Sequence, residues 1–273
     1  MRGLRLDGLI GLSSAIQFES PSSWFTRAAL GQGVTVQELA SHVGWFAAQD
    51  LDLMFAVMYE AGLPKDIPAL AGLEVARRVL VGYQRSGCRA DRMLLMGRKR
   101  RGSESGGLLA TARRRARYRF CPACLKTDWV PYVRQEWRFN CWRYCPEHLC
   151  MLEEHCPHCA ATLELPASLV RGGHKKNGVA DLSYCVRCGG SLTAVGLRNL
   201  PSPCERENSL EIVQLANGRA ALAAMYHGRV RIKGEEGERP LQHLHMLENL
   251  GLLPTRNHAT PTERGLSAGE MRD

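Results

Sequence analysis

Long hydrophobic runs are absent from this sequence. No stretch approaches the roughly 18 consecutive apolar residues that a membrane-spanning helix needs, so we predict no transmembrane segment. The first residues also lack the pattern of a secretory signal, because Asp7 interrupts them and the short apolar run that follows has no small-residue cleavage site. Apart from one doubled cysteine motif, the sequence has no internal repeat.

Positive charge is concentrated in one segment of the chain. The 273 residues carry a formal net charge of +9. Residues 98–119 contain nine lysines and arginines against one acidic residue, Glu104, and so hold most of this excess. Such a block attracts a polyanion, most commonly nucleic acid, although a solvated basic linker would have the same composition. The DNA-contacting residues predicted here are Arg98, Lys99, Arg100, Arg101, Arg113, Arg114, Arg115 and Arg117.

Cysteine is abundant, with 11 residues, and its spacing favours metal binding over disulfides. Disulfide frameworks are typical of short secreted chains, whereas this chain is not short and we predict no secretory signal in it. A gap of two residues lets both side chains of a tight turn point at one ion. Thiolates and imidazole in a tetrahedron favour zinc, and reduced thiols favour a cytoplasmic location. The predicted ligands of two zinc ions are Cys121, Cys124, Cys145, His148, Cys156, Cys159, Cys185 and Cys188.

Two pairings of these ligands are open. Sequential use gives one site of three cysteines and a histidine, followed by one site of four cysteines, whereas interleaved use gives a cross-brace. We favour the sequential pairing, because the segment between Cys124 and Cys145 looks like a self-contained unit. Four aromatic residues of this segment could form a small core over the first ion: Trp129, Tyr132, Trp137 and Phe139.

A catalytic role for either ion is disfavoured, and we predict that the protein is not an enzyme. Catalytic zinc keeps one coordination position open for water, whereas four protein ligands can enclose each ion here. The zinc deaminase signature requires a glutamate two residues after its histidine, and Cys150 occupies this position.

Other residues near the cysteine pairs have more ordinary interpretations. The histidines that flank Cys156, which are His155 and His158, are expected to be exposed in a turn. The remaining cysteines are expected to be buried or incidental thiols: Cys88, Cys141, Cys150 and Cys204.

Basic and aromatic residues are mixed between 134 and 143, a composition suited to backbone and stacking contacts with nucleic acid. From this segment we predict that Arg134 and Arg138 contact DNA. Part of its aromatic content, which includes Trp137 and Trp142, is expected to belong to the core of the zinc region.

Four helices are predicted between residues 20 and 97. Ser20 followed by Pro21 is a favourable helix start. Thr35 with Glu38 makes a capping box for the second helix, and Asp50 caps the third. Two short helices joined by a glycine-containing turn resemble a helix-turn-helix, although many small bundles look the same. The expected ends are Gly31 and Gly33 for the first helix, Gly44 for the second, and Gly62 and Pro64 for the third, with a fourth helix over Leu70 to Val81.

The predicted fold class is mainly α with small zinc-ribbon or knuckle modules. We expect an N-terminal helical, helix-turn-helix-like domain over residues 1–97 and a basic linker over 98–118. A tandem zinc-binding region over 119–195 and a C-terminal helical portion over 196–254 follow, the latter with helices over 208–226 and 241–250. Residues 255–273 are polar and are expected to form a disordered tail.

Several of these motifs together resemble the TniQ family. The segments Phe18-Glu-Ser20 and Ser23-Trp-Phe-Thr-Arg-Ala-Ala29 resemble the opening of TniQ proteins. The likeness extends over roughly residues 6–195, in the same order. The segments that resemble the TniQ zinc region are Cys121-Pro-x-Cys124-Leu125, Pro131-Tyr-x-Arg134, Trp137-Arg138, Cys145-Pro-x-His148 and Cys156-Pro-x-Cys159.

The resemblance implies a non-catalytic adaptor for DNA transposition that acts in target-site selection. Such proteins recognise a target directly or dock on a guide-RNA effector complex, and they recruit an AAA+ ATPase that engages the transposase. Larger members carry further DNA-binding modules at the C-terminal end, where this sequence is short. The expected partners are DNA and the ATPase, with a guide-RNA complex and a second copy of the chain as further candidates. Two alternative functions are a zinc-ribbon transcriptional regulator, as the second hypothesis, and a zinc hydrolase, as the third.

Overall fold

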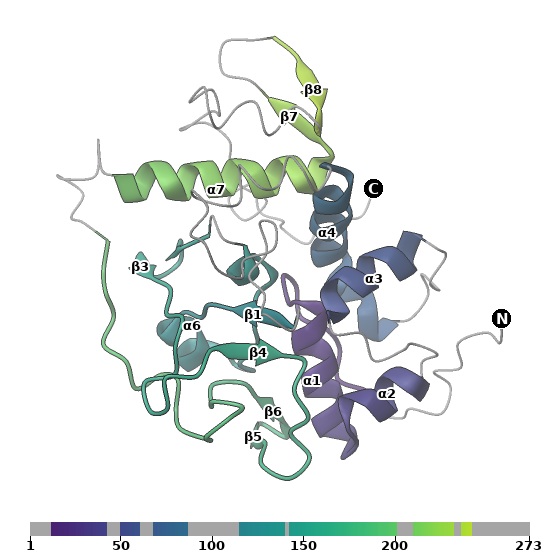
Figure 1. Ribbon diagram of the computed structural model, residues 1–273, viewed down its shortest axis with the longest axis vertical. Helices are drawn as coiled ribbons and strands as arrows, with labels where there is room; N and C mark the ends of the chain where they lie inside the picture. The colour runs from purple at the N-terminus through teal and green to yellow at the C-terminus, as the bar shows by residue number, and fades with distance from the viewer. Residues whose placement is uncertain are drawn as a thin grey trace.

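The computed structural model describes residues 12–42, 50–60, 68–86, 115–139, 142–200, 210–231 and 236–241. The helices are α1 (Pro21–Gln32), α2 (Val36–His42), α3 (Leu51–Glu60), the 3-10 helix η1 (Pro68–Leu73), α4 (Glu74–Ser86), α6 (Pro122–Thr127), the 3-10 helix η2 (Gln135–Arg138) and α7 (Leu210–His227). The strands are β1 (Ala116–Tyr118), β2 (Tyr144–Cys145), β3 (Cys150–Met151), β4 (Leu163–Leu165), β5 (His174–Lys176), β6 (Val179–Asp181), β7 (Arg229–Arg231) and β8 (Glu238–Pro240). Figure 1 shows α1 to α3 beside the strand-rich cysteine region, with α7 lying across the top of both α4 and that region.

The strands form four antiparallel two-stranded ladders, which are β1–β4, β2–β3, β5–β6 and β7–β8. Three of these ladders lie between residues 116 and 181, within the cysteine-rich part of the chain. The expected mainly α class is therefore confirmed only in part. The first and last parts of the described chain are helical, whereas the middle consists of short ladders and turns.

Helix starts follow the predicted capping residues. The Ser20 side chain accepts a hydrogen bond from the Ser23 amide at 3.1 Å, and Pro21 occupies the first turn of α1. The predicted end at Gly33 is confirmed, because this residue has a left-handed backbone with φ of 70°. The predicted end at Gly31 is wrong: this residue lies inside the last turn of α1, where the backbone remains helical.

The predicted capping box is present at the start of α2. The Glu38 amide donates to Thr35 Oγ1 at 3.1 Å, and the Thr35 amide donates to Glu38 Oε2 at 2.7 Å. Asp50 caps α3 by accepting from the Leu53 amide at 3.2 Å. The expected helix ends at Gly44, Gly62 and Pro64 lie outside the described residues.

The fourth helix begins and ends later than predicted. Residues 68–73 form the 3-10 helix η1, and α4 runs from Glu74 to Ser86. At the C-terminal end, α7 confirms most of the helix predicted over 208–226, whereas the helix predicted over 241–250 lies almost wholly outside the described residues. None of the helices that the structure describes is long and apolar enough to cross a bilayer.

Helix α1 is buried along most of its length. It packs against α2 and α3 on one side and against β4 and β6 of the cysteine region on the other. Trp24 and Phe25 are each 1% exposed and meet edge to face, with ring centroids 5.0 Å apart. A helix surrounded in this way acts as the shared core of the helices and the ladders.

Backbone hydrogen bonds also join the residues before α1 to the segment before η2. The Ser20 amide donates to the Val133 carbonyl at 2.9 Å, and the Gln135 amide donates to the Phe18 carbonyl at 2.8 Å. The Ser23 hydroxyl accepts from the Val133 amide at 3.0 Å. Two segments that are more than 100 residues apart in sequence therefore lie side by side.

Helix α7 packs against α4. A Cβ atom at Gly82 of α4 would lie only 2.0 Å from the carbonyl oxygen of Met225, so glycine lets the two helices approach closely. Met225 and Leu215 of α7 belong to the same hydrophobic cluster as Val75 and Val79 of α4, and this cluster continues into the cysteine region.

Candidate metal centre

The first cysteine pair lies at the start of helix α6. Cys121 is the N-cap of this helix, Pro122 takes the first helical position, and the Cys124 amide donates to Cys121 Sγ at 3.4 Å. A cysteine N-cap followed by proline thus starts a short helix and turns both thiols of the pair to the same side. The second pair comes from the β2–β3 hairpin, where Cys145 ends β2 and His148 lies in the connecting turn.

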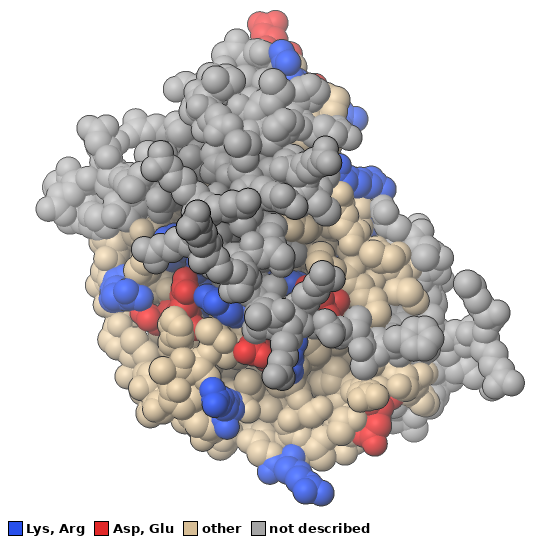
Figure 2. Space-filling view, viewed as in Figure 1, with Lys and Arg blue, Asp and Glu red and all other residues tan. Residues whose placement is uncertain are grey.

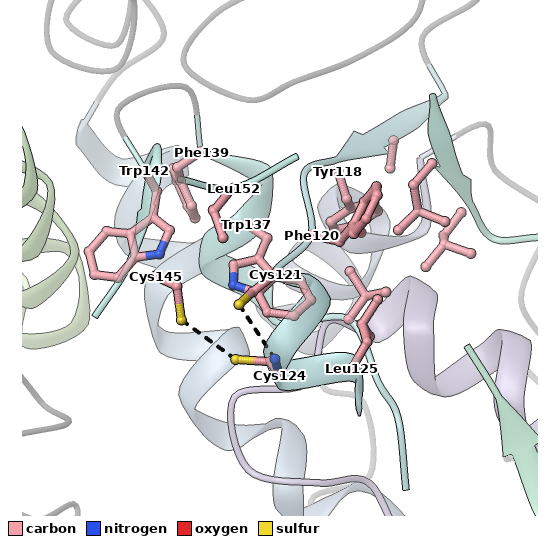
Figure 3. Packing of buried hydrophobic residues seen from close by; sticks show 14 of the residues in the cluster. Tyr118, Phe120, Cys121, Cys124, Leu125, Trp137, Phe139, Trp142, Cys145 and Leu152 are labelled. Carbon is pink, nitrogen blue, oxygen red and sulfur yellow. Dashed lines mark hydrogen bonds between the residues drawn. The ribbon is translucent and has the colours of Figure 1, made fainter. Parts of the chain in front are cut away.

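The four ligand atoms of the first group have the spacing of a metal site. His148 Nδ1 lies 3.7 Å from Cys121 Sγ, 3.3 Å from Cys124 Sγ and 3.6 Å from Cys145 Sγ. Cys124 Sγ lies 3.5 Å from Cys145 Sγ. A tetrahedron with metal–ligand bonds of about 2.0 to 2.3 Å has edges of roughly 3.5 to 3.8 Å between its ligand atoms, so these distances are close to those of ligands around one ion. Figure 3 shows the three sulfur atoms converging beside Trp137.

The second group has the same spacing. Cys156 Sγ lies 3.7 Å from Cys188 Sγ, and Cys159 Sγ lies 3.8 Å from Cys185 Sγ. Within each of the two groups, all four ligand atoms lie within 4.8 Å of one another. The sequential pairing is therefore the one the chain forms, and the interleaved cross-brace is not.

The turns of the second group repeat one backbone design. The amide of Ala160 bonds the Cys156 carbonyl, and the amide of Gly189 bonds the Cys185 carbonyl, both at 2.9 Å. Each of these residues, Ala160 and Gly189, has a positive φ. The Gly190 amide also donates to Cys188 Sγ at 3.4 Å, a contact that stabilises a thiolate.

Hydrogen bonds among the thiols of the first group separate their pKa values. The bond from Cys124 lowers the pKa of Cys121 to about 7. Cys145 accepts from Cys121 and Cys124, which holds its pKa below the ordinary range of a thiol. The same hydrogen bonds with Cys121 and Cys145 raise the pKa of Cys124. Because the thiolate is the form that binds a metal, Cys121 and Cys145 are the two ligands that offer thiolates near neutral pH.

An apolar shell surrounds the first group. Trp137 and Phe139 are fully buried, and Tyr132 is 8% exposed, as predicted for a core over the first ion. The same prediction is wrong for Trp129, which is 77% exposed. The Trp129 carbonyl accepts from Asn177 Nδ2 at 3.0 Å, and this bond fixes its backbone against the β5–β6 hairpin while the ring faces solvent.

Arg134 does not face solvent, which argues against the DNA contact predicted for it. Its guanidinium donates to both carboxylate oxygens of Asp128, at 2.9 and 3.1 Å, and to Glu147 at 3.4 Å. Its side chain is 8% exposed. Glu147 in turn accepts from Cys124 Sγ at 3.4 Å. Arg134 therefore connects the end of α6 to the turn of the first group and positions its ligands.

Arg138 is likewise buried, with a side chain 1% exposed, so the same argument applies to its predicted DNA contact. It donates to Asp52 Oδ2 at 2.8 Å and forms an ion pair with Asp50. Asp52 also accepts from the Ser22 amide at 2.8 Å and from the Tyr118 hydroxyl. This network joins η2, the start of α3, the start of α1 and strand β1, so Arg138 has a structural role.

The buried tryptophans exclude the predicted stacking contacts. Trp137 is 0% exposed and Trp142 is 3% exposed, so neither ring can receive a base. Both belong to the hydrophobic cluster around the first cysteine group.

The predicted basic segment is described only at its end. Arg115 is half-exposed and lies 3.6 Å from Glu164, and Arg117 pairs with Glu154 at 2.9 Å. Arg98, Lys99, Arg100, Arg101, Arg113 and Arg114 lie outside the described residues.

Cys150 lies closer to the first group than the sequence indicates. Its thiol is fully buried, as expected, but it lies 3.6 Å from Cys121 Sγ. The β2–β3 register places Cys150 directly opposite Cys145. The signal in the sequence was the hairpin itself, since a short turn after Cys145 brings the following strand back to the ligand. His155 and His158 are exposed, as predicted, whereas Cys88, Cys141 and Cys204 lie outside the described residues.

Replacing Glu136 with glutamine is expected to stabilise the protein above neutral pH. Burial raises the pKa of the Glu136 carboxyl to about 7, above its ordinary value of 4.5. A raised carboxyl pKa means that stability falls as pH rises from about 4.5 to 7, because ionising the buried group costs free energy. The Glu136→Gln variant should be more stable by on the order of 2 to 3 kcal/mol at pH 8 and about equal at pH 4. Urea denaturation at both pH values measures this, and an equal effect at both would contradict it.

Comparison with models of protein families identifies a family for this chain. The family model described as TniQ matches residues 15–152. A search of curated proteins found no match to this chain. The matched residues include α1 to α4, the first cysteine group, and the bonds that join them. The chain belongs to the TniQ family.

Proposed function

We propose that this protein is a zinc-binding, non-catalytic adaptor for DNA transposition that takes part in target-site selection and recruits an AAA+ ATPase. The observation that carries the proposal is the TniQ match over residues 15–152, which places the chain in a transposition-associated family. The geometry of the two cysteine groups supports the zinc part of the proposal, and the family supports the adaptor part.

Zinc suits both groups. Three thiolates with one imidazole, and four thiolates, are donor sets that structural zinc takes in tetrahedral geometry. Four protein ligands in each group leave no coordination position for a substrate, so the ions would act as scaffold. Seven of the eight ligands are thiols, which a reducing cytoplasm would keep available.

The described helices offer little for phosphate contact by a helix-turn-helix. Neither α2 nor α3 contains a lysine or an arginine. In Figure 2, the lysines and arginines on the described part of the visible face lie singly, several of them beside acidic residues. Electrostatic attraction to DNA is therefore assigned to the basic segment that leads into β1, where Arg115 is half-exposed.

Replacing Arg113, Arg114 and Arg115 together with alanine is expected to weaken DNA binding and to flatten its salt dependence. Each phosphate contact releases counterions, so the loss of three should reduce the slope of log K against log salt by about 2 to 3. Binding to a duplex measured at several salt concentrations tests this. Arg229→Ala, which removes an exposed arginine of β7, is the control. A slope that is the same in the triple variant and the control would exclude the basic segment from DNA contact.

An exposed aromatic surface is a second candidate for nucleic-acid contact. Trp129 is 77% exposed, and the adjoining β5–β6 hairpin contributes the exposed Lys175. Lys176 of this hairpin donates to the Asp128 carbonyl at 2.9 Å, which holds the hairpin beside Trp129. A base can stack on such a ring while lysine neutralises phosphate.

The Trp129→Ala variant is expected to bind single-stranded DNA about tenfold more weakly, because one stacked base contributes about 1 to 3 kcal/mol. Fluorescence anisotropy with a labelled oligonucleotide measures the effect. Val170→Ala removes another exposed apolar side chain and should leave binding unchanged. Equal affinities for the two variants would remove Trp129 from the proposed surface.

The adaptor proposal is tested with the ATPase of the same mobile element. The purified protein should bind this ATPase directly. Deletion of the gene that encodes the proposed adaptor should abolish or redistribute insertions in a transposition assay. If the protein binds DNA at its own promoter but neither binds the ATPase nor affects insertion, it is a transcriptional regulator instead.

A further inference from the structure

A further thiol, that of Cys150, lies beside the first cysteine group but outside the four ligand atoms that all lie within 4.8 Å of one another. Cys121, Cys124, Cys145 and His148 complete a four-ligand set, and Cys150 Sγ lies 3.6 Å from Cys121 Sγ. This separation is close to the distance between two ligands of the same ion, which is roughly 3.8 Å for two thiolates. The Cys150 side chain is fully buried, so its thiol faces the group and not solvent.

The β2–β3 ladder holds Cys150 in this position. Cys150 is directly opposite Cys145, and residues opposite each other in an antiparallel ladder project to the same face. The thiols of the two residues also interact with each other. The Met151 amide donates to the Arg198 carbonyl at 2.8 Å, and the Leu200 amide donates to the Leu149 carbonyl at 2.8 Å. A neighbouring segment therefore fixes β3 from its other side.

His148 is the least enclosed of the four ligands. It is half-buried, whereas the three cysteines of its group are buried. It lies in the turn between β2 and β3, next to Leu149, which is 37% exposed and has φ of 46°. His148 thus lies outside the β2–β3 ladder that carries Cys145 and Cys150.

We infer that Cys150 is a reserve ligand of the first metal site, which can take the place of His148 and convert a three-cysteine, one-histidine site into a four-cysteine site. In the exchange, the metal–nitrogen bond to His148 would break, a metal–sulfur bond to Cys150 would form, and the proton of that thiol would leave to solvent. Cys150 would then complete the set of four protein ligands, and the turn that carries His148 and Glu147 would be released from the site. The inference rests on the proposed metal at this group.

Cobalt substitution tests the exchange, because the intensity of the sulfur-to-cobalt charge-transfer band rises with the number of thiolate ligands. Four proteins are compared: the unaltered chain, Cys150→Ser, His148→Ala, and the variant that combines both changes. The unaltered chain and Cys150→Ser should each bind two ions with the same spectrum. His148→Ala should also bind two ions, with a stronger charge-transfer band. The combined variant should bind one.

Each other outcome overturns the reserve role in a distinct way. Loss of an ion from His148→Ala, or a failure of this variant to fold, means that Cys150 cannot replace the histidine. Loss of an ion from Cys150→Ser means that Cys150 is a resident ligand. Two ions in the combined variant mean that another donor completes the site. If the unaltered chain binds no ion, the proposed metal site itself is wrong. The metal content of the unaltered chain therefore distinguishes a failure of the metal site from a failure of the ligand exchange.

Discussion

Replacing Arg138 with methionine is expected to destabilise the protein by about 3 to 5 kcal/mol. Arg138 is 1% exposed and Asp52 is 0% exposed, so the substitution leaves two carboxylates without their cation, one of them fully buried. Removing one partner of a buried ion pair costs far more than the pair contributes, because the remaining charge stays desolvated. The loss should also loosen α3 from β1, since Asp52 joins Arg138 to Tyr118.

The matched control for this prediction is Arg198→Met. Arg198 makes two hydrogen bonds to Glu153, both at 3.0 Å, but its side chain is 59% exposed. An exposed pair contributes less than about 1 kcal/mol, so the control should unfold almost like the unaltered protein. Urea denaturation of both variants measures the difference. Similar midpoints for the two would show that the network around Arg138 does not hold the fold together.

Replacing Cys145 and Cys150 together with alanine is expected to remove one of two zinc ions and to unfold the chain at ambient temperature. Structural zinc contributes about 10 to 16 kcal/mol of binding free energy in zinc-finger peptides. The stability of a whole domain is about 5 to 15 kcal/mol. Cys145 is 1% exposed and lies in the same hydrophobic cluster as Trp137 and Leu152, so the ion and the core are lost together.

Cys188→Ala is the comparison for this second prediction. Cys188 belongs to the second group and is exposed, at the rim of the structure. Its loss should release the second ion but leave the far-ultraviolet circular dichroism of the helices largely intact. Zinc content and circular dichroism of both variants distinguish the two roles. A variant with both Cys145→Ala and Cys150→Ala that keeps two ions, or that stays folded with one, would contradict the assignment of the first group to the core.

Local signals in the sequence predicted much of the fold. Capping by Ser20, the box formed by Thr35 and Glu38, and the cap at Asp50 all depend on residues within one turn, and all three are confirmed. The cysteine pairs have the same local character, because the gap of two residues already sets the direction of both thiols. The family resemblance is also confirmed by the match over residues 15–152.

Long-range contacts set the features that the sequence did not predict. Arg134 and Arg138 looked like surface cations, but their partners Asp128, Asp50 and Asp52 come together only when the helices pack on the cysteine region. A composition of arginines and tryptophans suits a nucleic-acid surface and a buried network equally well, so burial decides between them. Arg138 is separated in sequence from Asp50 by 88 positions and from Asp52 by 86 positions, and ion pairs over such separations leave no periodic signal in the sequence.

The motifs that carry the family resemblance form the scaffold that holds the first group. Glu19 and Arg27 form an ion pair in which both side chains are at most 1% exposed. Ser23 Oγ donates to Glu19 at 2.7 Å and accepts from the Val133 amide at 3.0 Å. The N-terminal motif is therefore bonded to the segment that precedes η2.

Metal analysis of the purified protein, followed by circular dichroism in excess chelator, is the most direct test of whether these two cysteine groups hold the fold together. We expect two zinc ions per chain and loss of the folded structure once they are removed. A chain that contains no metal when isolated and keeps its secondary structure in chelator would contradict the account.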